Sequence, residues 1–150
     1  IFMAEDYGLC TYEKHHKLKI LMFLTSMREK RDEFIANNFE IEYQDLERSS
    51  FEDSYEDKLL NYIKKNKISE VKMFEIEDKD FEKRLTACLT INNIPLTFIR
   101  SPMFLLRRDD FPTLCGKSST LRMANFYKNV RRKLDILIDE NKKPVKDHFQ

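Results

Sequence analysis

Residues 70–99 read EVKMFEIEDKDFEKRLTACLTINNIPLTFI, and this stretch decides the fold class. Glu70 to Ile76 predicts a strand, and Asp78 is of a residue type that caps helix N-termini. The following helix carries apolar residues at helical spacing, and Ile94 to Ile99 predicts a second strand. The apolar positions of that helix are Phe81, Leu85, Cys88 and Leu89. The order strand, helix, strand predicts two parallel strands joined by a helical crossover.

The same order extends toward the start of the chain. Ile1 to Glu5 is a short apolar run that ends in an acid, and Phe39 to Tyr43 alternates apolar and acidic residues as an edge strand does. A helix follows each strand: one from Lys14 to Asn37, and one that begins at Ser54 with Asp57 three residues on. The alternation predicts an α/β fold, a three-layer Rossmann-like domain with a mostly parallel sheet.

The predicted helix over residues 14–37 has an unusually wide apolar face. One stripe of it falls at helical spacing, comprising Ile20, Phe23, Leu24, Met27 and Phe34. Leu18, Leu21 and Met22 widen that stripe. We therefore expect the first half of this helix to be buried on most sides.

Length and composition indicate one domain over residues 1–150. Hydrophobic residues make up 41% of the chain and charged residues 35%, with two Gly and four Pro, which is typical of a globular protein. The net charge of +1 creates no overall field that would attract nucleic acid. Residues 100–118 form a long excursion, and residues 119–150 form a last helix and a linker toward a further domain.

The last helix is expected to start at Ser118, Ser119 or Thr120 and to run to about Asp139. Its inward-facing residues are predicted to be Leu121, Phe126, Val130, Leu134, Leu137 and Ile138. Both chain ends have the character of cut ends, so we expect either a fragment of a longer protein or a chain that lacks terminal residues.

Cysteine use and hydropathy predict the compartment. The three cysteines, Cys10, Cys88 and Cys115, are odd in number and widely spaced, which favours a reducing environment over a disulfide framework. The longest apolar run, Ile20 to Leu24, is far shorter than the ~20 residues that span a bilayer. We expect a cytoplasmic protein that makes no contact with membranes.

The segment after the first strand is the first candidate site, because ligands of α/β sheets bind at the carboxyl ends of strands. It holds Glu5, Asp6, Tyr12, His15 and His16. Adjacent histidines early in a helix point about 100° apart, which disfavours a shared metal ion. Two interpretations stay open: one histidine caps or packs while the other is solvated, or a ring contacts a bound heterocycle. Glycine-rich phosphate-binding motifs do not occur.

Catalytic motifs are also missing from the sequence. It contains no nucleophile elbow and no revealing cysteine and histidine pair, so we expect no catalytic residue and no metal site in this chain. One basic cluster occurs toward the C-terminus, made of Arg107, Arg108, Arg122, Arg131, Arg132 and Lys133. This cluster is interpreted first as a solvated helix face, then as an interdomain salt-bridge surface, and last as a DNA contact.

Ordered motifs at both ends of the chain resemble the N-terminal domain of the photolyase-related proteins, the iron-sulfur bacterial cryptochromes and photolyases. Near the start, the matching motifs are Tyr12, His15-His16-Lys17-Leu18-Lys19 and Thr25-Ser26-Met27-Arg28. Toward the end they are Phe104-Leu105, Phe111, Gly116, Thr120-Leu121-Arg122-Met123, Phe126-Tyr127, Val130-Arg131-Arg132, Ile138-Asp139 and Pro144-Val145. Residues 47–93 agree in pattern alone. Phe74 to Asp78 lacks the Pro and Gly that the family usually has there.

The resemblance implies a function. It implies an antenna domain that binds a ribityllumazine, followed by a helical domain that binds flavin adenine dinucleotide (FAD) and an iron-sulfur cluster. Light absorbed by the antenna would reach the flavin, which repairs damaged DNA or signals. The implied partners are that flavin-binding domain and damaged DNA. The resemblance also implies a further strand before Ile1, at the centre of the sheet.

The resemblance assigns four chromophore-binding positions. Tyr12 and His15 stand at positions that line the antenna pocket, and Glu5 ends the same strand. Leu9 stands where some members have an acid that reaches the antenna, and Ala4 stands where some have Cys. An alternative function is a stand-alone Rossmann-like binding or scaffolding domain without catalytic activity.

Overall fold

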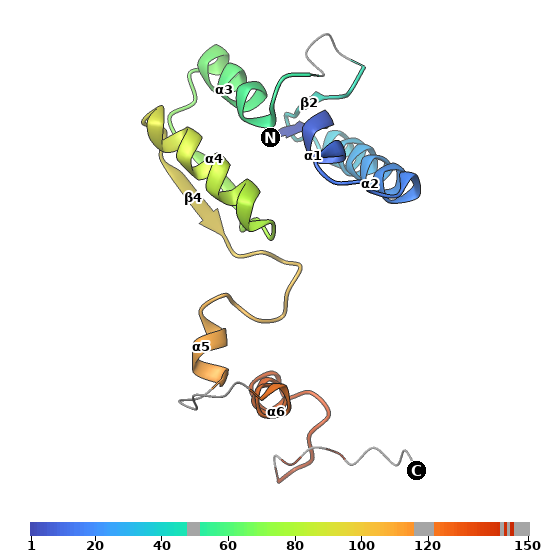
Figure 1. Cartoon of the computed structure of the whole chain (residues 1–150), viewed down its shortest axis with the longest axis vertical. Helices are drawn as coiled ribbons and strands as arrows, with labels where there is room; N and C mark the ends of the chain where they lie inside the picture. Colours follow the sequence, from blue (N-terminus) through green and yellow to red (C-terminus); the bar gives the residue numbers. More distant parts are fainter. Residues whose placement is uncertain (48–51, 116–121, 142, 144, 146–150) are drawn as a thin grey trace. The chain divides into compact units, whose positions relative to one another are not determined.

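The computed structural model describes residues 1–47, 52–115, 122–141, 143 and 145, and strands alternate with helices along most of the chain (Figure 1). The elements in order are β1 (Phe2–Ala4), α1 (Tyr7–Thr11), α2 (Lys17–Ala36), β2 (Glu42–Gln44), α3 (Tyr55–Asn66), β3 (Val71–Phe74), α4 (Lys79–Ile91), β4 (Leu96–Ile99), α5 (Asp110–Cys115) and α6 (Met123–Leu134). This order confirms the predicted α/β class. None of the helices in the described ranges has the length and apolarity needed to cross a membrane.

The strands pair in parallel, as predicted. β1 runs parallel to β2, with Met3 opposite Tyr43. In the other pair, the Val71 N–H donates to Pro95 O at 2.9 Å and the Glu75 N–H donates to Ile99 O at 2.8 Å. Both bonds advance in the same direction along the two chains, so β3 and β4 are also parallel. Within the described residues, the strands form two two-stranded sheets, β1 with β2 and β3 with β4.

Two helices begin at the caps that the sequence predicted. Ser54 Oγ accepts a hydrogen bond from the Asp57 N–H at 3.2 Å at the start of α3. Asp78 Oδ1 accepts from the N–H groups of Asp80 and Phe81 at 3.0 and 2.9 Å at the start of α4. These side chains satisfy main-chain donors that have no partner inside the helix.

The chain forms two compact units, each with its own internal contacts. The first unit comprises Ile1–Val71 and Asp78–Thr97, and the second comprises Lys72–Glu77 and Phe98–Gln150. The expected organisation of residues 1–150 as one domain, with a linker at its end, stays a prediction.

The core of the first unit lies among α3, α4, β1 and β2. Its buried apolar residues are Ala4, Tyr43, Leu59, Ile63, Leu85 and Leu89. Aromatic rings connect the elements: Phe2 of β1 contacts Tyr62 of α3 at a centroid distance of 5.0 Å, and Tyr55 contacts Phe81 of α4 at 5.2 Å. Burial of these rings removes a large apolar area from water, which stabilises the unit.

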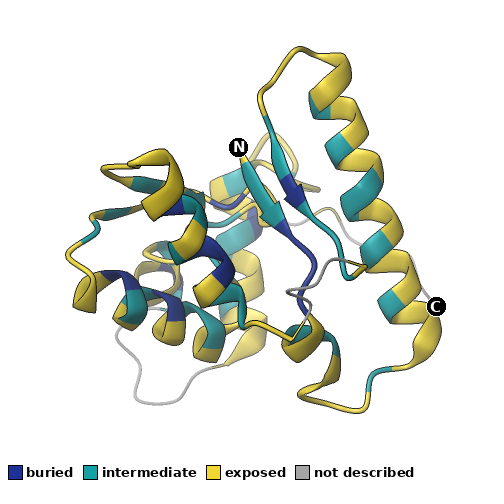
Figure 2. Ribbon diagram, turned by 90° about the horizontal axis from the view of Figure 1, so that it is seen from above, coloured by how far each residue is buried: buried dark blue, intermediate teal, exposed yellow. Residues whose placement is uncertain are grey.

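Helix α2 departs from the prediction, because none of its residues is buried (Figure 2). The expected stripe exists in part, with Ile20, Leu24 and Met27 half-buried. The added residues Leu18, Leu21 and Met22 are exposed, Leu18 by 61%. The physical reason is that the apolar side chains in the first half of α2 point to several sides of the helix, whereas the rest of the unit packs against one side.

The second unit contains α5 and α6, and the last helix is shorter than predicted. It ends at Leu134, well before Asp139, because Asp135 adopts the left-handed conformation with φ 56°. The Arg131 guanidinium donates to Ile136 O at 3.2 Å and also to Leu137 O, which stabilises this turn. Leu137, expected to face inward, is exposed. The predicted start at Ser118, Ser119 or Thr120, and the predicted inward residue Leu121, lie outside the described residues.

Candidate ligand-binding site

A cavity of about 390 Å³ lies in the first unit, directly after β1, and we call it the main cavity. Its lining residues are Ala4, Asp6, Leu9, Cys10, Tyr12, His15, Lys19, Ile20, Phe23, Leu24, Met27, Tyr55 and Phe81. Most of these side chains are aromatic or aliphatic, and the volume is in the range of small-molecule sites. The main cavity can therefore hold a flat organic ring system.

Three of the four predicted site residues meet in the main cavity. Leu9, Tyr12 and His15 all line it, and the rings of Tyr12 and His15 contact each other edge to face at a centroid distance of 5.3 Å. The short helix α1 contains Leu9 and is followed directly by Tyr12, its C-cap residue, and His15 lies between α1 and α2. Sequence periodicity missed α1, since five residues are too few to show a helical repeat. Chromophore binding by these residues stays a prediction.

Tyr12 is tethered to the start of α4. Its hydroxyl donates a hydrogen bond to Asp78 Oδ2 at 3.2 Å. Desolvation and the bond to the Asp78 carboxylate both raise the pKa of the Tyr12 hydroxyl above its usual value. The hydroxyl therefore stays protonated and remains a donor at neutral pH.

Asp6 is a buried acid of the main cavity that was not among the predicted binding positions. Its Oδ1 accepts a hydrogen bond from the Leu9 N–H at 2.7 Å and so caps α1. Its Oδ2 is buried and has no hydrogen-bond partner among the described residues, although Lys58 Nζ lies 3.6 Å away. A buried acceptor without a hydrogen bond costs about 1–3 kcal/mol. A ligand N–H or O–H group at this oxygen would remove that cost.

Glu5 has a structural environment and is not among the residues that line the main cavity. Its carboxylate is fully buried and accepts hydrogen bonds from Arg28 Nε at 2.6 Å, the Tyr43 hydroxyl at 2.6 Å and the Leu46 N–H at 3.1 Å. Burial alone would raise the pKa of Glu5, but these three donors together lower it to about 2. Glu5 therefore joins β1 to α2 and β2 as a carboxylate.

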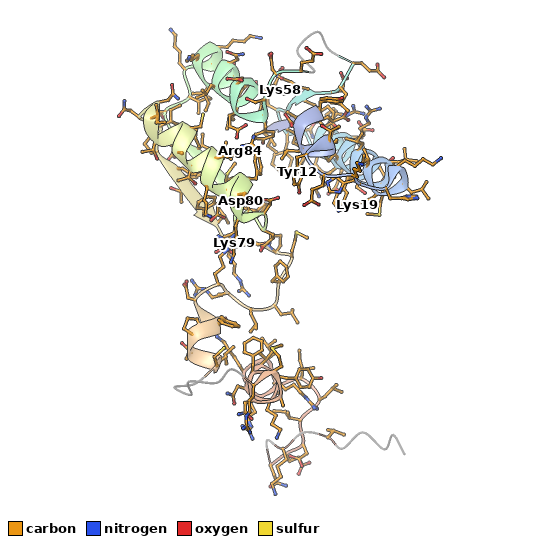
Figure 3. All side chains as sticks on the ribbon, in the orientation of Figure 1. Tyr12, Lys19, Lys58, Lys79, Asp80 and Arg84 are labelled. Atoms are coloured by element: carbon orange, nitrogen blue, oxygen red, sulfur yellow. The ribbon has the colours of Figure 1, made fainter. Side chains whose placement is uncertain are left out.

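Lys58 completes the charge balance beneath the main cavity. This residue lies on α3 (Figure 3) and is buried. Its Nζ donates a hydrogen bond to Glu5 O at 3.1 Å. Two acids, Glu5 and Asp6, thus face two bases, Arg28 and Lys58. The buried charges are paired, as burial in a low-dielectric environment requires.

The two adjacent histidines have different roles. His16 Nδ1 accepts a hydrogen bond from the Leu18 N–H at 3.2 Å, so His16 caps α2. His15 lines the main cavity, where its Nδ1 lies 3.5 Å from Lys19 Nζ. One histidine is therefore a cap, as the first interpretation predicted, and the other has a position from which it can contact a ligand.

A smaller cavity of about 200 Å³, which we call the side cavity, adjoins the main cavity. Its lining residues are Leu9, Tyr12, Glu13, Asp78, Asp80, Phe81 and Arg84. Leu9, Tyr12 and Phe81 line both cavities and so form their common wall. Every residue of both cavities belongs to the first unit.

The basic cluster lies in the second unit, where several of its members have local partners. Arg131 is buried against main-chain carbonyls, and Lys133 pairs with Asp110. Arg108 donates to Ile76 O and has Glu75 within 4.0 Å. These contacts favour a structural interpretation for those residues, and a DNA contact stays a prediction.

Comparison with known proteins assigns the chain to a family. A comparison with curated proteins found no match. The family described as deoxyribodipyrimidine photo-lyase-related protein matches the chain over residues 1–150. The chain therefore belongs to the deoxyribodipyrimidine photo-lyase-related protein family.

Proposed function

We propose that this chain is the antenna-chromophore-binding part of a photolyase-related flavoprotein, with a ribityllumazine as the chromophore. One observation carries the proposal: the main cavity has mostly aromatic and aliphatic walls, and its lining includes Asp6, whose buried Oδ2 has no hydrogen bond among the described residues. A flat heterocycle presents two apolar faces and a polar edge. These walls and this anchor match that pattern.

The residues of the main cavity fit the ring chemically. Leu9, Phe23 and Phe81 offer apolar surface for its faces. Asp6 Oδ2 offers an acceptor for a ring N–H, and a hydrogen bond to a charged group contributes about 1.5–3 kcal/mol. His15 and Tyr12 extend the aromatic wall. Leu9 supplies no carboxylate, whereas Asp6, three residues earlier at the N-cap of α1, supplies one.

Membership in the family supports the rest of the proposal. The antenna would absorb light and pass the energy to an FAD held, with an iron-sulfur cluster, by a helical domain downstream of these residues. The reduced flavin would then donate an electron to a pyrimidine photoproduct in DNA, or start a signal. The role of the present chain is to hold and orient the antenna and to exclude water from it.

Titration of the protein with ribityllumazine, followed by the ligand's fluorescence, tests the proposal. We expect saturable binding that Asp6→Asn weakens by about tenfold or more, because the amide nitrogen replaces an anionic acceptor. The amide oxygen can still cap α1, so the fold should persist. Asp32→Asn, at an exposed position of α2, serves as the matched control and should bind as the wild type does.

Thermal shift separates this proposal from a stand-alone scaffolding function. Ribityllumazine at 100 times its dissociation constant should stabilise the protein by about 2.7 kcal/mol. The absence of stabilisation by ribityllumazine, riboflavin and nucleotides alike would contradict the antenna proposal and favour the scaffold. Stabilisation by a nucleotide alone would also contradict it.

A further inference from the structure

We infer that the second unit holds a binding site for a small aromatic zwitterion, of the class of the free aromatic amino acids. The site is a cavity of about 220 Å³, which we call the second-unit cavity. That volume is below the ~300–1,000 Å³ of sites for drug-sized ligands, so it suits a single ring with a short polar tail. Its lining residues all belong to the second unit, and none of them lines the main cavity. The inference is therefore independent of the proposed function.

Three phenylalanines form most of the apolar wall of this cavity. The rings of Phe111 on α5 and Phe126 on α6 contact each other at a centroid distance of 5.3 Å, and Phe104 lies in the loop before α5. Phe104 is 53% exposed and Phe111 is 49% exposed. Large aromatic side chains that meet at a hollow and remain open to water are typical of a site for an apolar group. A ligand ring would pack against these rings and cover them.

Two side chains of opposite charge line the cavity without a close partner. Within the described ranges, the carboxylate of Glu77 and the guanidinium of Arg107 make no hydrogen bond and no ion pair. Asp110 feels the charge of Arg107, but its carboxylate oxygens are already bound by Lys133 and by the Arg107 N–H. One cation and one anion of the cavity are thus available to a ligand.

The other two charged residues of the cavity have structural roles. Glu75 Oε2 accepts a hydrogen bond from the Ser101 N–H at 3.0 Å, which joins the segments that follow β3 and β4. The Arg108 guanidinium donates to Ile76 O and lies 4.0 Å from the Glu75 carboxylate. Two acids and two bases line the cavity, so it exerts no net attraction on an anion such as phosphate. A ligand with one positive and one negative group matches the two charges that lack a close partner.

The hydroxyl group of Ser101 is an independent indication of a ligand. Ser101 lines the cavity, is 5% exposed, and its Oγ accepts a hydrogen bond from the Met103 N–H at 3.3 Å. The hydroxyl hydrogen has no acceptor among the described residues. Since buried polar groups are normally hydrogen-bonded, an acceptor from a ligand fits at this position. A ligand carboxylate has two oxygens, one for this hydroxyl and one for Arg107, and the ammonium group is left for Glu77.

Four ligands test the inference by isothermal titration calorimetry on the intact protein: L-phenylalanine, 3-phenylpropanoate, phenethylamine and N-acetyl-L-phenylalaninamide. The second ligand lacks the ammonium group, the third lacks the carboxylate, and the fourth lacks both charges. We expect the dissociation constant of L-phenylalanine to be about tenfold lower than that of either singly charged ligand, because each charged group contributes one charge-assisted hydrogen bond. The uncharged ligand should bind most weakly.

Two substitutions connect each ligand charge to its residue. Glu77→Gln should weaken the binding of L-phenylalanine by about tenfold and should not weaken that of 3-phenylpropanoate, which has no ammonium group to lose. Arg107→Gln should likewise weaken L-phenylalanine and should not weaken phenethylamine. Glu140→Gln and Arg132→Gln are the matched controls, because both positions are exposed, belong to the same unit and do not line the cavity.

The results that would overturn the inference are distinct from one another. If N-acetyl-L-phenylalaninamide binds as tightly as L-phenylalanine, the cavity accepts an uncharged aromatic residue of a polypeptide and the zwitterion is wrong. If L-phenylalanine does not bind, or if the two substitutions weaken it no more than their controls do, the site itself is wrong. None of these results bears on the antenna proposal. Circular dichroism and the unfolding midpoint of each variant show that a loss of binding is not a loss of fold.

Discussion

Glu5 links the acid stability of the protein to a single carboxylate. The pKa of Glu5 is lowered from the ordinary value of 4.5 to about 2, so folding stabilises the ionised carboxylate relative to the protonated acid. This contribution is present above about pH 5 and is lost as the pH falls toward 2. The contribution of Glu5 to the free energy of unfolding is at most about 3 kcal/mol, because a pKa difference of one unit between the folded and unfolded states corresponds to about 1.4 kcal/mol. Urea unfolding between pH 7 and pH 2 measures it.

The variant Glu5→Gln isolates that contribution. We expect a loss of about 2–3 kcal/mol at pH 7, since Arg28 and Leu46 lose an anionic acceptor, and a flatter stability curve below pH 5. Arg28 is partly exposed and can be solvated, which limits the loss. Glu33→Gln removes an exposed pair with Lys30 and should change the free energy of unfolding by less than about 0.5 kcal/mol. A wild-type acid limb in Glu5→Gln would contradict the assignment.

The site was predictable where residues are close in sequence, and unpredictable where they are distant. Tyr12 and His15 belong to one ordered motif, and both line the main cavity. Glu5 was expected to end the strand beside the pocket, but its partners Arg28 and Tyr43 lie 23 and 38 residues away. No pattern of neighbouring residues in the sequence predicts such contacts. For the same reason the sequence did not show that Asp6 has one oxygen in a cap and the other buried near Lys58.

At the scale of elements, the helix caps carry a measurable share of the stability. Asp78→Ala removes the cap of α4 and the acceptor for Tyr12, and Ser54→Ala removes the cap of α3. We expect each to lower the free energy of unfolding by about 1 kcal/mol, and Asp78→Asn to cost less than about 0.5 kcal/mol. Chemical denaturation measures all three. Asp53→Ala, at an exposed position just before the α3 cap, is the control, and an equal loss there would refute the capping argument.

The helices and strands show which structural features can be predicted from a single sequence. Caps and strand patterns act through neighbouring residues, so Ser54, Asp78 and the four strands of the described residues were predicted. The boundaries are less exact, since β2 begins at Glu42 and the predicted strand began at Phe39. Burial depends on what packs against a helix, and the sequence of α2 does not contain that information, so Leu18 and its neighbours were assigned to a core that does not cover them. The early end of α6 depends on a left-handed Asp135 and on hydrogen bonds from the Arg131 side chain to the carbonyls of Ile136 and Leu137. Neither feature changes the helical spacing of the apolar residues from which the end of α6 was predicted.

At the scale of the whole molecule, the main cavity and the side cavity are both built from one of the two compact units. Their residues come from Ile1–Val71 and Asp78–Thr97. Ligand binding stabilises the conformations that contact the ligand, so its effect on local opening should be confined to that unit. We expect saturating ribityllumazine to slow amide hydrogen exchange in β1, α1 and the first turns of α4, by a factor that rises with ligand concentration.

Helix α6 provides the internal control for this prediction, because it belongs to the second unit. Its amides should exchange at the same rate with and without the ligand, and the Asp6→Asn variant should lose the protection of β1 and α1 at the same ligand concentration. Protection that appears in α6 as strongly as in α1 would mean that the ligand acts outside the main cavity. Protection in neither element would mean that it does not bind, and hydrogen exchange read by mass spectrometry distinguishes the two results within one experiment.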